Sequence, residues 1–413
     1  MQISSCVEGT TLPPGTIRCP EERTGCFMSR RAEVPACPVP LSPAFRLVAQ
    51  CTIRPPEPQW PLWRDGIVAL ATQVTDWDEV LRLVRRHQVP VLVDDALKKS
   101  VAADAFPDNV RKALTQAAKR SRMNAMLQIA HSRRIATGFM QAGIPVIQLK
   151  GAPLSRRLYG DATLRCCGDV DLLIDFDSLG EAVAILEVMQ FVLMQPIPES
   201  NSLFGLVTRH AYHDCSLVHA STQLHLELHW RPGAWGRRTS ALLFRQSRND
   251  AEFGPAAPPE ILEMLDLLAH GTTHYWVLIK WLSDIQQAAL ICPASFWDDV
   301  MVRAREMGAL CAVRIGAILA CWIFQDRAGP LVRIAADASF RDFQGARYAL
   351  GRMLAHRIHP RDPASIAAKV FYRLATCTSY QLISTACRCV PLLNRREQYS
   401  SKTVAGNLDA RRS

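Results

Sequence analysis

The sequence lacks several features that would define its class at once. Aromatic residues make up only 7% of the chain and charged residues 21%, and no run of about 18 uncharged apolar residues is present. We therefore expect no membrane-spanning helix and no membrane partner. Apolar residues nevertheless reach 49%, a globular composition that excludes wholesale disorder, a collagen-like chain and a coiled coil. With 413 residues, the chain is long enough for one large domain or two ordinary ones.

The signals of a secreted or zinc-ribbon protein are also missing. Fourteen cysteines are present, but no C-x2-C pair occurs, and the adjacent Cys166 and Cys167 lack the spacing of a structural zinc site. The first residues after Met1 contain neither the basic nor the apolar segment of a signal peptide. We therefore expect free thiols and a cytoplasmic protein.

Positive charge is concentrated towards the end of the chain. The whole chain has 48 Lys+Arg against 38 Asp+Glu, a net charge of +10, and residues 341–413 alone have 13 against 4. Only this region offers the clustered cations that non-specific nucleic-acid binding requires. Aromatic residues suited to base stacking are not interleaved with it. The pattern favours a solvated basic helix and tail, and a nucleic-acid-binding protein acting through this region is the less favoured alternative.

The chain divides into five parts by composition and period. Eleven of the 26 prolines and five of the 14 cysteines fall within residues 1–61, without any sustained period. Such a stretch cannot easily bury an apolar stripe. The predicted parts are a disordered segment (1–59), a helical part (60–142), a sheet core (143–232), a helical C-terminal part (233–390) and a basic flexible tail (391–413). In the helical part, Asp76 is predicted to cap one helix, and another runs from about Pro107 to Gln141.

After Gly143 the pattern changes from helical to mixed. Residues 144–149 and 168–174 predict short strands, and residues 152–159 predict a helix between them. Asp177 and Ser178 predict the cap of the next helix. Residues 223–230 alternate strictly between polar and apolar, so His225, Glu227 and His229 share the polar face of one strand.

Three carboxylates in these strands are the candidate catalytic residues. Asp169 and Asp171 lie two apart in one strand, so both leave the same face, with Cα atoms about 6.5–7 Å apart. Their repulsion is relieved by a cation, and two divalent metals separated by ~4 Å fit this spacing. Glu227 on a second strand would complete the coordination and accept a proton. The sequence therefore predicts Asp169, Asp171 and Glu227 as ligands of Mg²⁺ or Mn²⁺; two solvated aspartates at a strand end are the alternative.

A phosphate-binding turn is predicted just before these carboxylates. The first strand ends at Lys150 and Gly151 and enters a helix, whose free backbone N–H groups favour triphosphate oxygens. Lys150 and Gly151 are therefore candidate nucleotide-binding residues, and Arg165 is a third because its guanidinium can clamp a phosphate. The alternatives are that Lys150 only flanks the turn and that Arg165 has a surface role.

These segments together resemble a known family. Gly143–Leu154, Leu158–Asp161, Leu164-Arg165 and Gly168–Ile174 are similar to the L-K-G…L-Y…R…G-D-[IV]-D-L-L signature of the uncharacterised bacterial nucleotidyltransferase family, within the polymerase-β-like superfamily. Leu228-His229-Trp230 resembles its L-H-W strand. The likeness covers roughly residues 60–290.

The resemblance implies a fold and a reaction. The fold is α+β, with a minimal nucleotidyltransferase mixed sheet flanked by helical N- and C-terminal parts. The reaction moves a nucleoside monophosphate from a nucleoside triphosphate to an unidentified acceptor, which is a small molecule, peptide or protein, and releases pyrophosphate. In two respects the chain departs from the superfamily. Gly151 is followed by Ala152 rather than by serine or glycine, and Asp169 follows Gly151 by 18 positions, which is longer than the usual superfamily spacing. A non-catalytic nucleotide-binding module of the same fold therefore remains an alternative.

Three further features of the sequence bear on the site. His270 and His274 have the i, i+4 spacing of a metal pair, but a glycine stands where a metalloprotease has glutamate, so zinc is not favoured. Lys280 and Asp284 predict an i, i+4 ion pair on one helix. His229 either contacts substrate or is a strand histidine satisfied by a neighbour.

Overall fold

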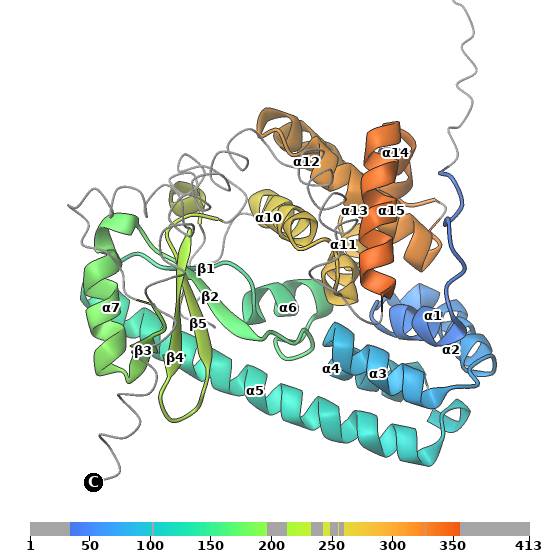
Figure 1. Cartoon of the computed structure of the whole chain (residues 1–413), viewed down its shortest axis with the longest axis horizontal. Coiled ribbons are helices and arrows are strands. Elements are labelled where there is room, and N and C mark those ends of the chain that lie inside the picture. The colour runs from blue at the N-terminus through green and yellow to red at the C-terminus, as the bar shows by residue number, and fades with distance from the viewer. Residues whose placement is uncertain are drawn as a thin grey trace, which may run out of the picture. The chain divides into compact units, whose positions relative to one another are not determined.

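The computed structural model describes residues 34–100, 103–195, 213–232, 243–247, 255, 260–326 and 328–355 (Figure 1). The chain divides into two units, Met1–Glu33 and Val34–Ser413, and every described residue belongs to the second. The predicted disorder of residues 1–33 and the predicted flexible tail at residues 391–413 therefore lie outside the described residues.

Five α-helices precede the sheet in the described part of the chain. They are α1 (Pro43–Cys51), α2 (Trp60–Ala71), α3 (Trp77–His87), α4 (Pro90–Ser100) and α5 (Asp108–Gln141), with short 3-10 helices at Glu57–Gln59 and Ala103–Ala105. The predicted cap of α3 is confirmed, because an Asp76 oxygen accepts a hydrogen bond from the Glu79 N–H at 2.9 Å. The predicted end of α5 is confirmed as well, since the chain leaves that helix through Gly143 at a φ of 73°.

Helix α1 corrects the prediction that residues 1–59 are disordered. Ser42 caps this helix by accepting a hydrogen bond from the Phe45 N–H at 3.1 Å, and its hydroxyl donates to Glu79 of α3 at 2.9 Å. Phe45 and its apolar neighbours are buried in the main hydrophobic core. The helix has only nine residues, too few to show a sustained period, so its stability comes from tertiary packing that the local pattern does not reveal.

In the described residues the sheet has five strands and a mixed topology. They are β1 (Ile147–Gln148), β2 (Asp169–Leu173), β3 (Phe191–Leu193), β4 (Asp214–His219) and β5 (His225–His229). Their order is β1-β2-β5-β4-β3, with β2 and β5 parallel and the other neighbours antiparallel. Helix α6 (Ala152–Tyr159) lies between β1 and β2 in the chain, and α7 (Leu179–Val188) precedes β3. This mixed sheet with flanking helices confirms the α+β prediction.

Of two local predictions within this region, one was wrong in length and the other was right in position only. Strand β1 has two residues rather than six, because Pro145 has no N–H to donate and the Ile144 N–H bonds to the end of α5. Ser178 is the N-cap residue of α7, as predicted, but its side chain makes no capping hydrogen bond, and the side-chain cap in this region is that of Asp175. The Asp175 carboxylate accepts a hydrogen bond from the Asp177 N–H at 3.0 Å and starts a 3-10 turn that leads into α7.

The two faces of the sheet have opposite character. Leu172 of β2 and Leu228 of β5 pack against apolar side chains of α5 and α7, the helices that flank the sheet in Figure 1. Strand alternation sends Asp171 and Glu227 to the other face. There Leu173 packs with Leu262 of α10, a helix of the C-terminal part. The polar side chains of β2 and β5 therefore lie between the sheet and the C-terminal helices.

A four-residue helical stretch at 243–246 and six longer helices follow the sheet in the described residues, and the longer helices share a core with α1–α4. They are α10 (Glu260–Thr273), α11 (Ile279–Ile291), α12 (Ala294–Glu306), α13 (Leu310–Phe324), α14 (Pro330–Ala336) and α15 (Phe340–Leu354). Helix α13 is apolar on almost every side and lies at the centre of this core. None of the described helices is both long and apolar enough to cross a membrane.

Candidate active site

Two acidic side chains meet across neighbouring strands on the polar face of the sheet. The parallel pairing of β2 and β5 sets Asp171 directly beside Glu227, and Asp169 beside His225. Side chains alternate along a strand, so these residues project from one face. The Asp171 side chain is 8% exposed and that of Glu227 is 36% exposed. The register therefore brings Asp171 and Glu227 together and leaves Asp169 two residues away on the same face.

His229 lies between these carboxylates and was not selected as a site residue from the sequence. Its Nε2 atom lies 3.1 Å from an Asp171 oxygen and 3.4 Å from a Glu227 oxygen. The ligand atoms of these three residues lie within 4.8 Å of one another, close enough to share one cation. In the described part of the chain, Asp169 is not a member of this closely spaced group. The sequence did offer a signal for His229, because it shares the polar face of residues 223–230 with Glu227.

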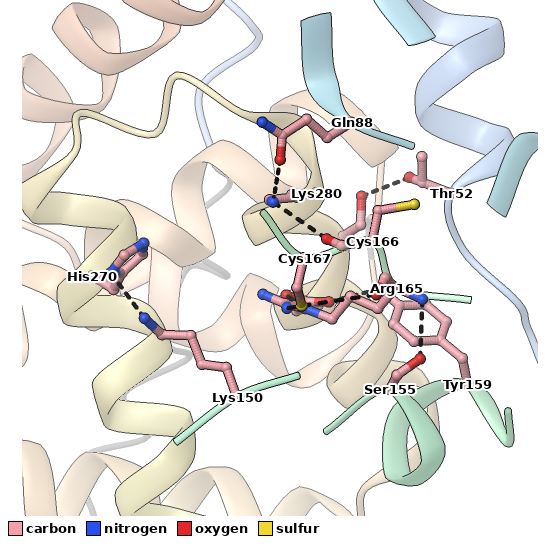
Figure 2. Close-up of polar contacts among 12 residues, drawn as sticks. Thr52, Gln88, Lys150, Ser155, Tyr159, Arg165, Cys166, Cys167, His270 and Lys280 are labelled. Carbon is pink, nitrogen blue, oxygen red and sulfur yellow. Dashed lines mark hydrogen bonds and ion pairs between the residues drawn. The ribbon is translucent and has the colours of Figure 1, made fainter. Parts of the chain in front are cut away.

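Lys150 reaches the same cluster from the end of β1. Its ammonium lies 3.7 Å from an Asp171 oxygen and donates a hydrogen bond to Nδ1 of His270 at 3.2 Å. Figure 2 shows the Lys150 and His270 side chains directed towards each other. Lys150 is 9% exposed, so it is part of the buried site rather than a flanking residue of the turn.

The charges of this cluster shift the protonation of its members in opposite directions. Burial, Asp171 and Glu227 together raise the pKa of Asp169. Burial also opposes ionisation of Asp171, but Lys150 and His229 outweigh it and hold the pKa of Asp171 far below its usual range. Burial lowers the pKa of His229, but its hydrogen bonds to Asp171 and Glu227 raise that pKa to about 10. Asp171 is therefore ionised between two cations, whereas Asp169 is held in a repulsive environment.

A fourth carboxylate, Asp266 of α10, belongs to the same electrostatic neighbourhood. Asp266 is 9% exposed, and burial raises its pKa, although Lys150 and His229 partly oppose the shift. Conversely, burial lowers the pKa of Lys150, but Asp171 and Asp266 raise it above the usual value. Asp266 was missed in the sequence, where a single acidic residue amid leucines of an apolar helix was the available signal.

The turn between β1 and α6 requires glycine at position 151. Gly151 has a φ of 82°, and a Cβ there would collide with the Gln148 side chain. The turn leads into the first helical residue, Ala152, and a small pocket at this point is also lined by Asp169 and Gln128 of α5. The predicted phosphate turn and one predicted metal ligand therefore border the same hollow.

Comparison with known proteins identifies the family. Residues 73–325 match the model of a family described as uncharacterised nucleotidyltransferase, and this match spans more than half of the chain. The chain belongs to this nucleotidyltransferase family. Membership supports nucleotidyl transfer as the general activity and implies a nucleoside triphosphate as substrate. No curated protein and no solved structure matches the chain.

Arg165 of this nucleotidyltransferase is held in a buried ion pair. Its Nε donates to an Asp284 oxygen of α11 at 2.7 Å, and the Tyr159 hydroxyl donates to the other Asp284 oxygen at 3.0 Å. Figure 2 shows the Arg165 side chain beside Cys167, to which its Nη1 donates at 2.9 Å. The alternative of a surface role is wrong, since Arg165 is only 4% exposed. Its predicted contact with a phosphate stays a prediction, and the geometry favours anchoring of the loop before β2.

Lys280 corrects the prediction of an i, i+4 pair with Asp284. Its ammonium instead contacts the Gln88 side-chain oxygen and lies 3.3 Å from the Cys166 carbonyl oxygen, as Figure 2 shows. Burial and the nearby Arg165 lower the pKa of Lys280. The pair does not form because Asp284 is already bonded to Arg165, a partner 119 positions away that local spacing cannot reveal.

The spacing of His270 and His274 reflects aromatic packing. The two ring centroids lie 4.5 Å apart, and those of His270 and Trp281 lie 5.0 Å apart. Among the described residues, this pair is not part of any group of three metal-ligating side chains. Burial and the positive charge of Lys150 lower the pKa of His270 well below its usual value, so this ring is neutral.

Proposed function

We propose that this nucleotidyltransferase moves a nucleoside monophosphate from a nucleoside triphosphate to an acceptor hydroxyl or phosphate. The observation that carries the proposal is the register of β2 and β5, which sets Asp171 beside Glu227 with Lys150 and His229 around them. Family membership supports the same class of reaction.

The donor set fits a hard divalent cation. Asp169, Asp171 and Glu227 offer carboxylate oxygens, which are the ligands that Mg²⁺ and Mn²⁺ prefer. We propose that these three residues hold the metal, as a pair of ions when nucleotide is bound. Such ions neutralise the charge of the triphosphate and favour departure of pyrophosphate. Burial and the repulsion of Asp171 and Glu227 raise the pKa of Asp169, and a bound cation would relieve this repulsion.

Glu227, Lys150 and the turn at Gly151 have the remaining roles in the proposed reaction, which are proton acceptance and phosphate binding. Glu227 has the more exposed side chain of the strand-paired carboxylates, at 36% against 8% for Asp171, so it is the better placed to meet an acceptor. The acceptor oxygen forms a bond to the α-phosphorus, and the bond from that phosphorus to the bridging oxygen breaks. Pyrophosphate leaves with the electron pair, and the acceptor proton passes to Glu227. Lys150 and the N–H groups of the turn at Gly151 receive phosphate oxygens.

The direct test is pyrophosphate release. The full chain is incubated with ATP, CTP, GTP or UTP, with Mg²⁺ or Mn²⁺, and with water or candidate acceptors. We expect release from at least one nucleotide, dependent on the metal. Asp171→Asn should lose that release and Asp299→Asn, an exposed aspartate of α12, should keep it. Nucleotide binding by thermal shift without release, under every condition, would support the non-catalytic module instead.

Two observations favour the alternative of a non-catalytic nucleotide-binding module. Ala152 opens α6 and offers no hydroxyl to a phosphate. Two cations of the chain, Lys150 and His229, already neutralise Asp171 in the absence of metal. Nucleic-acid binding through residues 341–413 stays a prediction, because residues 356–413 lie outside the described part of the chain.

A further inference from the structure

We propose that His213, Asp214 and His229 form a second cation site that binds a transition-metal ion such as Zn²⁺ or Co²⁺. This site lies beside the proposed catalytic carboxylates and uses the opposite side of the His229 ring. It goes beyond the proposed transfer reaction and does not depend on it.

Strand pairing assembles the three ligands. Asp214 of β4 is the register partner of His229 of β5, so both side chains leave the same face of the sheet. His213 precedes Asp214, and its carbonyl oxygen accepts a hydrogen bond from the Trp230 N–H at 2.9 Å, which fixes the start of β4 against β5. The His213 Nδ1 lies 3.5 Å from an Asp214 oxygen. One ligand atom from each of the three residues lies within 4.8 Å of the others.

An unpartnered ring nitrogen points to a missing ligand. His229 is 5% exposed, and its Nε2 is occupied by Asp171 and Glu227. Its Nδ1 is buried and has no hydrogen-bond partner among the described residues. A histidine that binds a metal through one ring nitrogen usually donates the other N–H to a carboxylate, which fixes the ring and its tautomer. In His229, Nε2 makes the contact with a carboxylate, that of Asp171, and Nδ1 is the ring nitrogen that remains to bind a cation.

The ligand chemistry selects the class of ion. Two imidazoles and one carboxylate suit Zn²⁺, Co²⁺ and related ions, whereas Mg²⁺ prefers oxygen ligands alone. Three protein ligands leave a fourth position for water, which is typical of an open zinc site. The side chains of His213 and Asp214 are 23% and 24% exposed, so the cation has a path from solvent. Binding replaces the proton on Nδ1 of His229, which passes to solvent.

The test measures Co²⁺ or Zn²⁺ binding to the metal-free full chain in excess Mg²⁺, which competes for carboxylate oxygens. We expect one Co²⁺ per chain with visible absorption. Asp214→Asn and His213→Gln should each weaken binding at least about 10-fold. His225→Gln, an exposed histidine on the same strand face, is the matched control and should bind as the wild type does. Circular dichroism confirms that each variant is folded, and the two substitutions provide independent evidence.

Two results would overturn the inference. Unchanged Co²⁺ affinity in folded Asp214→Asn and His213→Gln would show that these residues are not ligands. Loss of Co²⁺ in Glu227→Gln, with retention in Asp214→Asn, would assign the ion to the carboxylates instead. Pyrophosphate release is a separate measurement, so a chain that binds Co²⁺ in the expected pattern but releases no pyrophosphate would refute only the proposed function.

Discussion

Two buried charge clusters in this nucleotidyltransferase differ in how well their charges are balanced. In the Arg165 cluster (Arg165, Asp284 and Tyr159), one cation meets one carboxylate, and a hydroxyl satisfies the second carboxylate oxygen. In the carboxylate cluster, two cations face four acidic groups. Its members are Asp169, Asp171, Glu227, Asp266, Lys150 and His229.

From this difference we infer a structural role for the Arg165 cluster and a binding role for the carboxylate cluster. A matched buried pair is closed, and removal of one partner leaves an uncompensated charge that destabilises the fold. A cluster with excess negative charge remains repulsive until cations arrive, so it is suited to binding them. The sequence predicted a phosphate contact for Arg165 and, separately, an ion pair between Lys280 and Asp284. The structure instead pairs Arg165 with Asp284, so residue spacing alone does not reveal which buried charges are balanced.

The largest effect is expected from Asp169→Asn, which removes one charge from the unbalanced cluster. Pyrophosphate release should fall below detection, because the cation loses a ligand. The free energy of unfolding should stay the same or increase, since burial and repulsion by Asp171 and Glu227 raise the pKa of Asp169 in the folded chain. Urea denaturation and the release assay check both expectations. A variant that is active, or one that is strongly destabilised, would place Asp169 outside this role.

Glu227→Gln is expected to have the next largest effect. The amide keeps the size of the side chain but removes its charge and basicity, so turnover should fall about 10²-fold or more while nucleotide still binds. Glu181→Gln, an exposed glutamate of α7 that lies outside the cluster, is the control. Single-turnover kinetics and thermal shift with nucleotide separate the two quantities. Full turnover in Glu227→Gln would remove this residue from the chemistry.

Lys150→Gln should act mainly on substrate affinity. A hydrogen bond to a charged group contributes about 1.5–3 kcal/mol, so loss of the ammonium should raise KM for the nucleotide by about 10- to 100-fold. The control is Lys112→Gln on the exposed side of α5. An unchanged KM with a lower kcat would contradict this expectation. It would indicate that Lys150 stabilises the Asp171 carboxylate and does not bind the triphosphate.

The smallest expected effect is on the pH dependence of stability, and it comes from the buried, uncharged imidazole of His87. His87 ends α3 and its Nδ1 accepts a hydrogen bond from the Ile279 N–H at 3.2 Å. Burial, assisted by Arg86, lowers its pKa from 6.5 to about 4. The unfolded chain therefore takes up the proton first, and stability is lost as the pH falls from about 6.5 to about 4. His87→Gln should reduce this loss in denaturation series at several pH values, and an identical pH dependence would contradict it.

Local signals in the sequence predicted much of the fold and part of the site. The cap at Asp76, the change of period at Gly143 and the alternation around Glu227 depend on neighbours within a few residues, and the structure has a helix, a helix end and a strand there. The sequence placed Glu227 on a second strand near Asp169 and Asp171, but it did not establish that β2 pairs with β5. This pairing requires two strands more than fifty residues apart to meet in one register.

The rest depends on contacts that no local pattern encodes. Arg165 finds Asp284 at a separation of 119 positions, and Lys280 finds Gln88 at a separation of 192. Asp266 enters the site only because α10 packs over the polar face of the sheet. These partners are set by how the helices pack, so spacing on one helix predicted the wrong pair for Lys280.

The central claim is that the carboxylate cluster serves transfer and the Arg165 cluster serves stability. The most direct test measures pyrophosphate release per folded molecule and the free energy of unfolding for Asp169→Asn and Arg165→Met side by side. Asp169→Asn should lose release and keep its stability, because burial and its acidic neighbours already disfavour the ionised form of Asp169 in the folded chain. Arg165→Met should lose about 3–5 kcal/mol of stability and keep most of its release. Wild-type release by Asp169→Asn, or wild-type stability of Arg165→Met together with loss of its release, would contradict the account.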